Sequence, residues 1–138
     1  MMRVIILAVL TIFSLNCSAE NYIRLTGVSM HSTAGNNALN YGIGLEHELN
    51  NRWSVAGGWY RNSEWHGSAY SYGRYAVYRD DIWNIGIGVG GVTGYRTFKV
   101  TPMAIPDICY GVLCMLFAPK LEASGSNVLA FSFRLPLE

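Results

Sequence analysis

The stretches LNYGIGLEHEL (residues 39–49) and NVLAFSFRLPL (residues 127–137) decide the fold, because both alternate apolar side chains with polar or small ones. In the first, Ile43 and Leu45 share a face, and Glu46 lies on the other. A period of two predicts a β-strand, and about ten such residues are what a tilted strand needs to cross a bilayer. The apolar face of the second stretch comprises Leu129, Phe131, Phe133, Leu135 and Leu137, with Ala130, Ser132 and Arg134 behind it.

Residues 1–19 have the layout of a secretory signal peptide. Arg3 is followed by an apolar run from Val4 to Leu15, and small residues stand before a cleavage point after Ala19. The alternative is a lipoprotein in which Cys17 becomes the lipidated N-terminus. We therefore expect export to the periplasm and, after cleavage, one domain over residues 20–138.

Composition separates the classes of protein that remain. Without Arg3 the chain has nine basic and nine acidic residues (10 − 1 against 9), so no net charge favours nucleic acid. Charged residues make up 14% of the sequence and hydrophobic ones 51%, yet no apolar run after the leader is long enough for a membrane helix. These features predict a monomeric all-β protein: an eight-stranded antiparallel up-and-down transmembrane β-barrel with a filled interior, in the outer membrane. A soluble sandwich or lipocalin-like barrel is the alternative.

Eight strands fit the mature length. The sixth and seventh are the least regular, because Pro102, Pro106 and Pro119 interrupt them. Short turns at 50–52 and 79–81 alternate with longer connections, as periplasmic turns and external loops do in bacterial barrels. The expected strands are 21–30, 38–49, 53–62, 68–78, 82–95, 98–108, 112–118 and 127–137.

Three-residue turns fix the register of two hairpins. A turn at 50–52 pairs Ile43 with Trp59 outward and Gly44 with Gly58 inward. A turn at 79–81 pairs outward residues Val77, Tyr75 and Gly73 with Trp83, Ile85 and Ile87. On the inner face it sets Arg74, Tyr72 and Tyr70 opposite Gly86, Gly88 and Gly90. Large inner side chains over inner glycines are how a narrow barrel fills its lumen.

Charged residues also occupy the predicted interior. Carboxylates and guanidinium groups enclosed in a narrow barrel pair into a structural plug, which makes a channel the last of the expected functions. The inward residues of this kind are Glu46, Glu48, Arg74 and Arg134, together with Tyr60, Tyr70 and Tyr72.

Two cysteines, Cys109 and Cys114, remain after cleavage of the leader. In an oxidising periplasm they could form a disulfide around a small loop, or they could be two buried thiols. The sequence leaves both interpretations open.

Serine, histidine and glutamate near the predicted outer rim include the residue types of a hydrolase, and ordinary solvated loops also contain them. The overall plan resembles the short eight-stranded outer-membrane barrels, including the OmpX-like proteins and the lipid A-modifying enzymes. Residues 31–46 are similar to the lipid A 3-O-deacylase (PagL-type) signature. They carry that signature as His31-Ser32-Thr33-Ala34-Gly35, then Asn40-Tyr41-Gly42 and Glu46.

This resemblance implies hydrolysis of an ester-linked acyl chain of lipid A without a metal or other cofactor. His31 would be the base and Glu46 the acid that orients it. Thr33 stands where the family has its serine, so the hydroxyl would come from Ser32, Thr33 or Ser63. The three histidines lack the spacing of metal ligands, and we expect no metal site.

Three cationic residues near the outer edge, Arg61, Arg96 and Lys99, suit lipopolysaccharide phosphates, since a guanidinium group contacts two phosphate oxygens at once. Snorkelling at the membrane interface is the alternative. We expect a non-catalytic envelope protein that acts through its external loops, by shielding the surface, blocking a receptor or binding a partner such as an envelope protein or phage receptor. A lipid A acyl-modifying enzyme is the second hypothesis.

Overall fold

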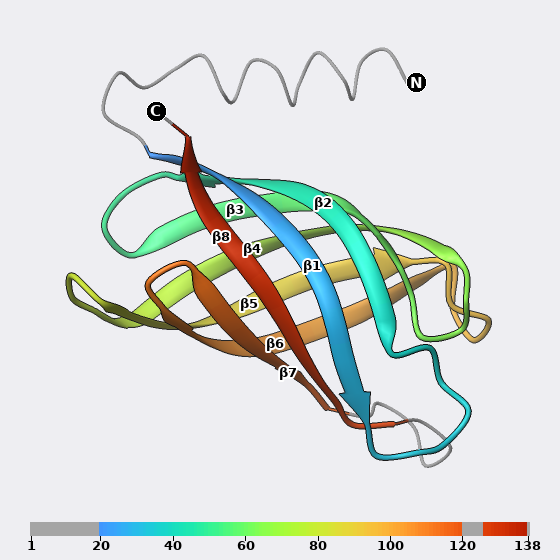
Figure 1. The fold of residues 1–138 in the computed structure, drawn as a ribbon. Helices are drawn as coiled ribbons and strands as arrows, with labels where there is room; N and C mark the ends of the chain where they lie inside the picture. The colour runs from blue at the N-terminus through green and yellow to red at the C-terminus, as the bar shows by residue number, and fades with distance from the viewer. Residues whose placement is uncertain (1–19, 120–125, 138) are drawn as a thin grey trace.

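The computed structural model describes residues 20–119 and 126–137, and these form one closed sheet of eight antiparallel strands (Figure 1). Each strand pairs with the next and β1 pairs with β8, which confirms the predicted all-β barrel. The strands are β1 (Asn21–His31), β2 (Leu39–Glu48), β3 (Trp53–Arg61), β4 (Gly67–Arg79), β5 (Trp83–Thr93), β6 (Val100–Tyr110), β7 (Leu113–Ala118) and β8 (Val128–Leu137).

The two ends of the barrel differ. The chain enters β1 and leaves β8 at the same end, where the connections after β2, β4 and β6 are short (Figure 1). We call this the turn end and the opposite one the loop end. The predicted leader, residues 1–19, lies outside the described residues. No helix of the described segments is both long and apolar enough to cross a membrane.

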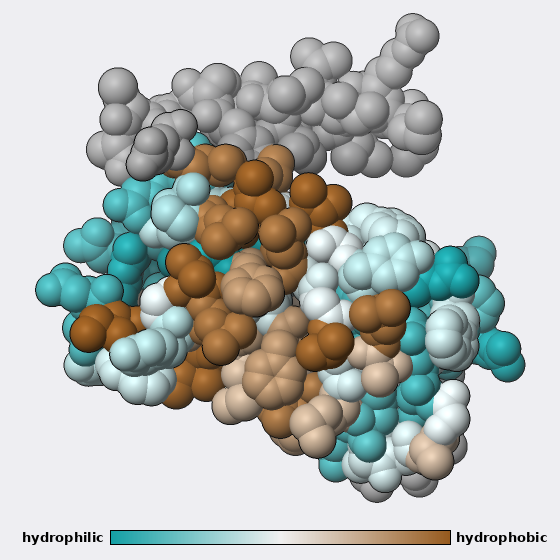
Figure 2. All heavy atoms as spheres, in the orientation of Figure 1, coloured by the Kyte–Doolittle hydropathy of each residue, from teal (hydrophilic) through white to brown (hydrophobic). Residues whose placement is uncertain are grey.

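Burial is inverted relative to a soluble protein. Ile43 is 58% exposed, whereas Glu46 is fully buried. Apolar side chains cover the middle of the face seen in Figure 2, and polar residues gather toward its two ends. The predicted arrangement, with aliphatic side chains outside and charged side chains inside, is therefore present.

The hairpin of β2 and β3 has the predicted register. Ile43 pairs with Trp59 on the outer face, and Gly44 pairs with Gly58 on the inner face. The turn is stabilised by Asn50, whose Oδ1 accepts hydrogen bonds from the backbone N–H groups of Arg52 and Trp53. An Asn side chain that bonds to the backbone two residues on is a turn-forming device, which explains why the sequence specified this register.

The predicted register of β4 and β5 is wrong by two residues. Tyr75 pairs with Ile87 rather than Ile85. The turn has two central residues, 81–82, which alone would exchange the two faces of the following strand. A β-bulge at Val77 adds one residue to β4 and restores the predicted faces.

Bulky inner residues nevertheless lie over glycines, as predicted. A Cβ atom added to Gly88 would lie 2.9 Å from Cδ2 of Tyr72, and one added to Gly58 would lie 2.8 Å from the hydroxyl of Tyr70. Both distances are too short for a real side chain. The inner glycines are thus required by the tyrosine rings that fill the lumen.

A second bulge, between Thr26 and Ser29, changes which residues of β1 face inward. Arg24 and Thr26 face the lumen before it, and Ser29 and His31 face the lumen after it. Val28, between the two pairs, is exposed. The bulge includes Gly27, a residue type that often marks such irregularities.

The seam between β6 and β7 is the shortest in the sheet, with pairs only from Asp107–Leu116 to Tyr110–Leu113. It includes the pair Cys109–Cys114, which forms a disulfide buried in the lumen. The disulfide interpretation of the two cysteines is thereby confirmed.

Candidate functional site

An ion cluster fills the turn end of the lumen. Glu46 Oε2 accepts a hydrogen bond from Arg24 Nε at 2.6 Å, and Oε1 accepts one from Ser54 Oγ at 2.9 Å. Arg134 Nη2 lies 3.2 Å from Glu46 and 2.6 Å from Glu48, and its guanidinium carbon stands 3.4 Å from the ring centre of Tyr22. These are the multiple partners that a buried charge needs.

A second part of the cluster joins β4 to β6. Arg74 donates through Nε to Asp107 Oδ2 at 2.8 Å, and through Nη2 to Asn84 Oδ1 at 2.9 Å. Three inward guanidinium groups therefore face three carboxylates. The predicted plug is present, with Arg24 and Asp107 as members that the sequence analysis did not name. Its buried cations are Arg24, Arg74 and Arg134, and its anions are Glu46, Glu48 and Asp107. The partly exposed Arg79 joins the cluster at its edge, with Nη1 2.9 Å from Glu48.

Beyond the ion cluster the lumen opens into two adjoining cavities of about 140 and 390 Å³. The first extends from Arg24 and Tyr72 toward the loop end, and the second extends under the loops to Glu64 and Phe98. The larger volume falls in the range of about 300–1,000 Å³ that is usual for small-molecule sites.

A network of amides and hydroxyls borders these cavities. Asn62 Nδ2 donates to Ser68 Oγ at 3.0 Å and to the Gly94 carbonyl at 2.9 Å, and its Oδ1 accepts from the N–H groups of Glu64 and His66. The φ of Gly94 is +87°, a conformation that disfavours side chains. Asn62 is therefore the residue that fixes the loop between β3 and β4.

His31 belongs to the same network. Its Nε2 lies 2.9 Å from the Asn37 carbonyl oxygen and 2.8 Å from Ser29 Oγ. A carbonyl oxygen only accepts, so Nε2 carries the proton. Ser29 in turn donates to Asn40 Oδ1. With its proton on Nε2, His31 is not placed to take a proton from Ser29.

The structure does not bring His31 and Glu46 together. Glu46 pairs with Tyr22, nine residues before His31 on β1. At about 3.3 Å per residue, the two side chains stand roughly 30 Å apart along the strand. Glu46 is also bound to the two arginines of the ion cluster. The base and acid implied by the resemblance thus lie in different halves of the lumen.

The three candidate hydroxyls are also dispersed. Ser32 Oγ lies 3.3 Å from Ser126 Oγ and accepts a hydrogen bond from Asn127 N–H, and the Thr33 N–H donates to Ser126. Both residues are exposed. Ser63 lines both cavities and accepts the Asn37 N–H through its carbonyl. None of these three hydroxyls has a hydrogen bond to His31 within the part of the chain that the structure describes.

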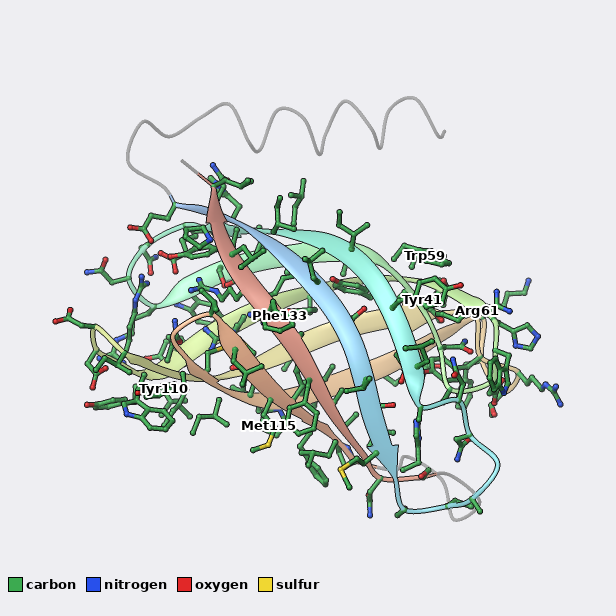
Figure 3. The ribbon with its side chains drawn as sticks, in the orientation of Figure 1. Tyr41, Trp59, Arg61, Tyr110, Met115 and Phe133 are labelled. Carbon is green, nitrogen blue, oxygen red and sulfur yellow. A yellow bond between two sulfur atoms is a disulfide. The ribbon has the colours of Figure 1, made fainter. Side chains whose placement is uncertain are left out.

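The cationic candidates lie at the loop end. Arg61 projects beside Trp59 and Tyr41 on the outside of the barrel (Figure 3). Arg96 and Lys99 are both exposed in the loop between β5 and β6, and Arg96 lies 3.9 Å from Glu64. Arg61 has no ion pair among the described residues. The three side chains do not form one preassembled site, and Arg96 is already paired with Glu64.

Of two lumen residues that the sequence analysis did not name, one could have been predicted from the sequence and the other could not. Arg24 stands between Ile23 and Leu25, so the alternation alone predicts that it faces inward. The same alternation would place Ser29 on the outer face, and only the bulge at residue 27 turns it inward. Neither protein-family models nor curated proteins match the chain.

Proposed function

We propose that the protein is an outer-membrane β-barrel that acts at the cell surface through its external loops and without catalysis. The observation that carries the proposal is the inverted burial, with the charges of Arg24, Glu46 and Arg74 enclosed and large apolar side chains exposed around the barrel. A lipid environment stabilises such an exterior, and closure of the sheet leaves no unpaired strand edge.

Aromatic side chains support the membrane placement. Trp53 packs on Tyr75, and Trp83 on Tyr110, each with ring centres 4.9 Å apart near the turn end. Tyr41 and Trp59 form a third pair near the loop end. Aromatic girdles at both interfaces are typical of outer-membrane barrels.

The loops supply a specific contact residue. Trp65 is exposed in the loop after β3 and has a φ of 66°, which is uncommon for a residue other than glycine. Asn62 holds this loop from below. Aromatic side chains on a fixed loop are frequent anchors at protein interfaces, and backbone strain concentrates at functional sites. Arg61, Arg96 and Lys99 add positive charge that suits lipopolysaccharide phosphates.

Two other roles fit the residues less well. The ion cluster fills the turn end of the lumen, which opposes a channel. Ester hydrolysis of lipid A needs a hydroxyl, a base and an orienting acid in contact. The protonated Nε2 of His31 and the distance to Glu46 oppose that role.

One experiment separates these roles. The full chain is expressed in a Gram-negative host, its membranes are fractionated, and lipid A mass spectra are recorded beside a His31→Ala variant. We expect the protein in the outer-membrane fraction and identical spectra for both. An acyl chain that is lost with the native protein and retained with H31A would overturn the non-catalytic role, and recovery in the inner membrane or cytosol would overturn the placement.

The loop role has its own readout. Cells are challenged with a panel of phages and colicins that use outer-membrane receptors, and survival is compared with that of cells without the protein. Protection that is reduced by Trp65→Ala but not by the turn-end variant Asp81→Ala supports action through the loops. Equal protection by both variants contradicts it.

A further inference from the structure

The deep end of the smaller cavity carries polar atoms that the protein leaves without a hydrogen bond. Arg24 is buried, and its Nη1 and Nη2 have no hydrogen-bond partner among the described residues. Nη2 lies 3.8 Å from Asp107 Oδ2, which is too far for a hydrogen bond. Thr26 Oγ1 and Ser132 Oγ are also without a partner there, and these two residues face each other across β1 and β8. Buried polar atoms without partners are rare, so such a group points to a ligand.

The wall above these atoms is apolar. Inward residues of β8, β7 and β6 line the cavities from Ser132 toward the loop end. They are Ala130, Val128, Leu116, Ala118, Ile105 and Met103. A polar pocket that continues into an aliphatic wall fits a molecule with an oxygen head and a hydrocarbon chain.

The charges around Arg24 indicate whether the oxygen group of the ligand is charged or neutral. Besides the three buried guanidinium groups and three carboxylates of the ion cluster, Arg79 lies 2.9 Å from Glu48 and 3.7 Å from Glu20. Four guanidinium groups thus face four carboxylates, so a further buried anion would have no cation of its own. Burial of an unpaired charge is far more costly than burial of a hydrogen-bonded neutral oxygen. An uncharged alcohol, ester or amide oxygen can accept from Arg24 and exchange hydrogen bonds with the two hydroxyl groups.

We propose that the lumen binds an uncharged amphiphile with a single aliphatic chain. Its oxygen head contacts Arg24, Thr26 and Ser132, and its chain lies along β6, β7 and β8 toward the loop end. This binding site goes beyond the loop-mediated role and does not depend on it, because it needs the closed barrel alone.

The test uses photolabelling of the full chain reconstituted in dioleoylphosphatidylcholine vesicles. The probe is 1-decanol with a diazirine near the far end of its chain, and decanoate with the same diazirine is the charged comparison. After irradiation, labelled residues are located by mass spectrometry. We expect decanol to label Met103 and Val128, and decanoate to label them at least about tenfold less, the equivalent of about 1.4 kcal/mol.

Two variants test the geometry. Arg24→Lys retains a cation beside Glu46 but removes both Nη donors, and Ala118→Trp fills the wall. Each should abolish the labelling of Met103 and Val128. Val89→Trp, on the outer face of β5, is the matched control and should leave it unchanged. If R24K does not form a heat-modifiable barrel, Thr26→Val removes a head contact with no change of charge.

The outcomes separate this inference from the membrane placement. Labels confined to outward residues such as Val89 and Phe133 would overturn the lumenal site while supporting contact with lipid. Lumenal labelling that persists in R24K, T26V and A118W would also overturn it. Equal labelling by decanoate would overturn the uncharged class of ligand.

Discussion

The two halves of the lumen are built from different interactions. At the turn end, guanidinium groups and carboxylates occupy the lumen as one ion cluster. At the loop end, amides, hydroxyls and tyrosines border cavities of about 140 and 390 Å³. The difference indicates that the turn end secures the barrel, while the loop end has room for recognition. Four changes test this division, in order of expected effect.

Loss of an ion-cluster carboxylate should have the largest effect. Glu46→Ala leaves Arg24 and Arg134 without their shared partner, and a broken buried ion pair costs about 3–5 kcal/mol. The free energy of unfolding in urea, followed by tryptophan fluorescence, measures this. Glu64→Ala, in a loop, is the control and should change stability by less than about 1 kcal/mol. Equal losses from both variants would contradict the special role of the turn end.

Overpacking of an inner glycine should have the next largest effect. In Gly88→Ala the new methyl group lies 2.9 Å from the Tyr72 ring, and such overpacking costs about 1–3 kcal/mol. Gly73→Ala is the matched control, because a Cβ there has no neighbour within 4 Å. Both variants are compared by urea unfolding. A barrel that accepts G88A as readily as G73A would show that the tyrosine is not tightly packed.

Loss of the loop-end amide should have a smaller and local effect. Asn62→Ala removes four hydrogen bonds, but the groups it frees at this end can bind water, so we expect about 1 kcal/mol. Hydrogen exchange should quicken in residues 62–68 and remain unchanged in β2. An increase throughout the barrel would mean that the loop end also holds the sheet together.

The turn after β4 should give the smallest effect, visible as a pH dependence. Hydrogen bonds from the Trp83 N–H, the Tyr78 hydroxyl and the Ile82 N–H lower the pKa of Asp80 below its ordinary value. A lowered folded pKa stabilises the protein above the unfolded pKa, about 3.9, and this contribution is lost as the pH falls through the folded value.

Urea unfolding midpoints between about pH 3 and 7 measure this contribution. Asp80→Ala should flatten the acid side of the profile, and Asp81→Ala should leave its shape intact. If the midpoint of D80A falls with pH in parallel with that of the native protein, protonation of Asp80 does not contribute to the loss of stability in acid.

The sequence predicted what depends on alternation and could not predict what depends on a single inserted residue. The faces of β2, β3 and β8 follow a strict period of two, and Asn50 specifies the first turn. At β4 and β5 there are two irregularities, a shorter turn and the bulge at Val77. Together they leave the inward and outward faces as predicted but shift the pairing of the two strands. The alternation of apolar and polar residues is the same with or without this pair of irregularities, so it cannot reveal them.

The candidate site shows the same limit. The inward position of Glu46 was predictable, but its contact with Arg134 on β8 depends on closure of the sheet. Ser29 reaches His31 only through the bulge at Gly27. The local similarity over residues 31–46 spans both halves of the lumen, with His31 in the loop-end network and Glu46 in the ion cluster.

The disulfide between Cys109 and Cys114 constrains the order of biogenesis. Both sulfur atoms are enclosed by the finished wall, so no thiol oxidase can reach them once the first and last strands have joined. Oxidation must precede closure, and the hairpin of β6 and β7 must already be linked when the sheet is sealed. A chain sealed while still reduced would keep two thiols permanently out of reach of the enzymes that could repair it.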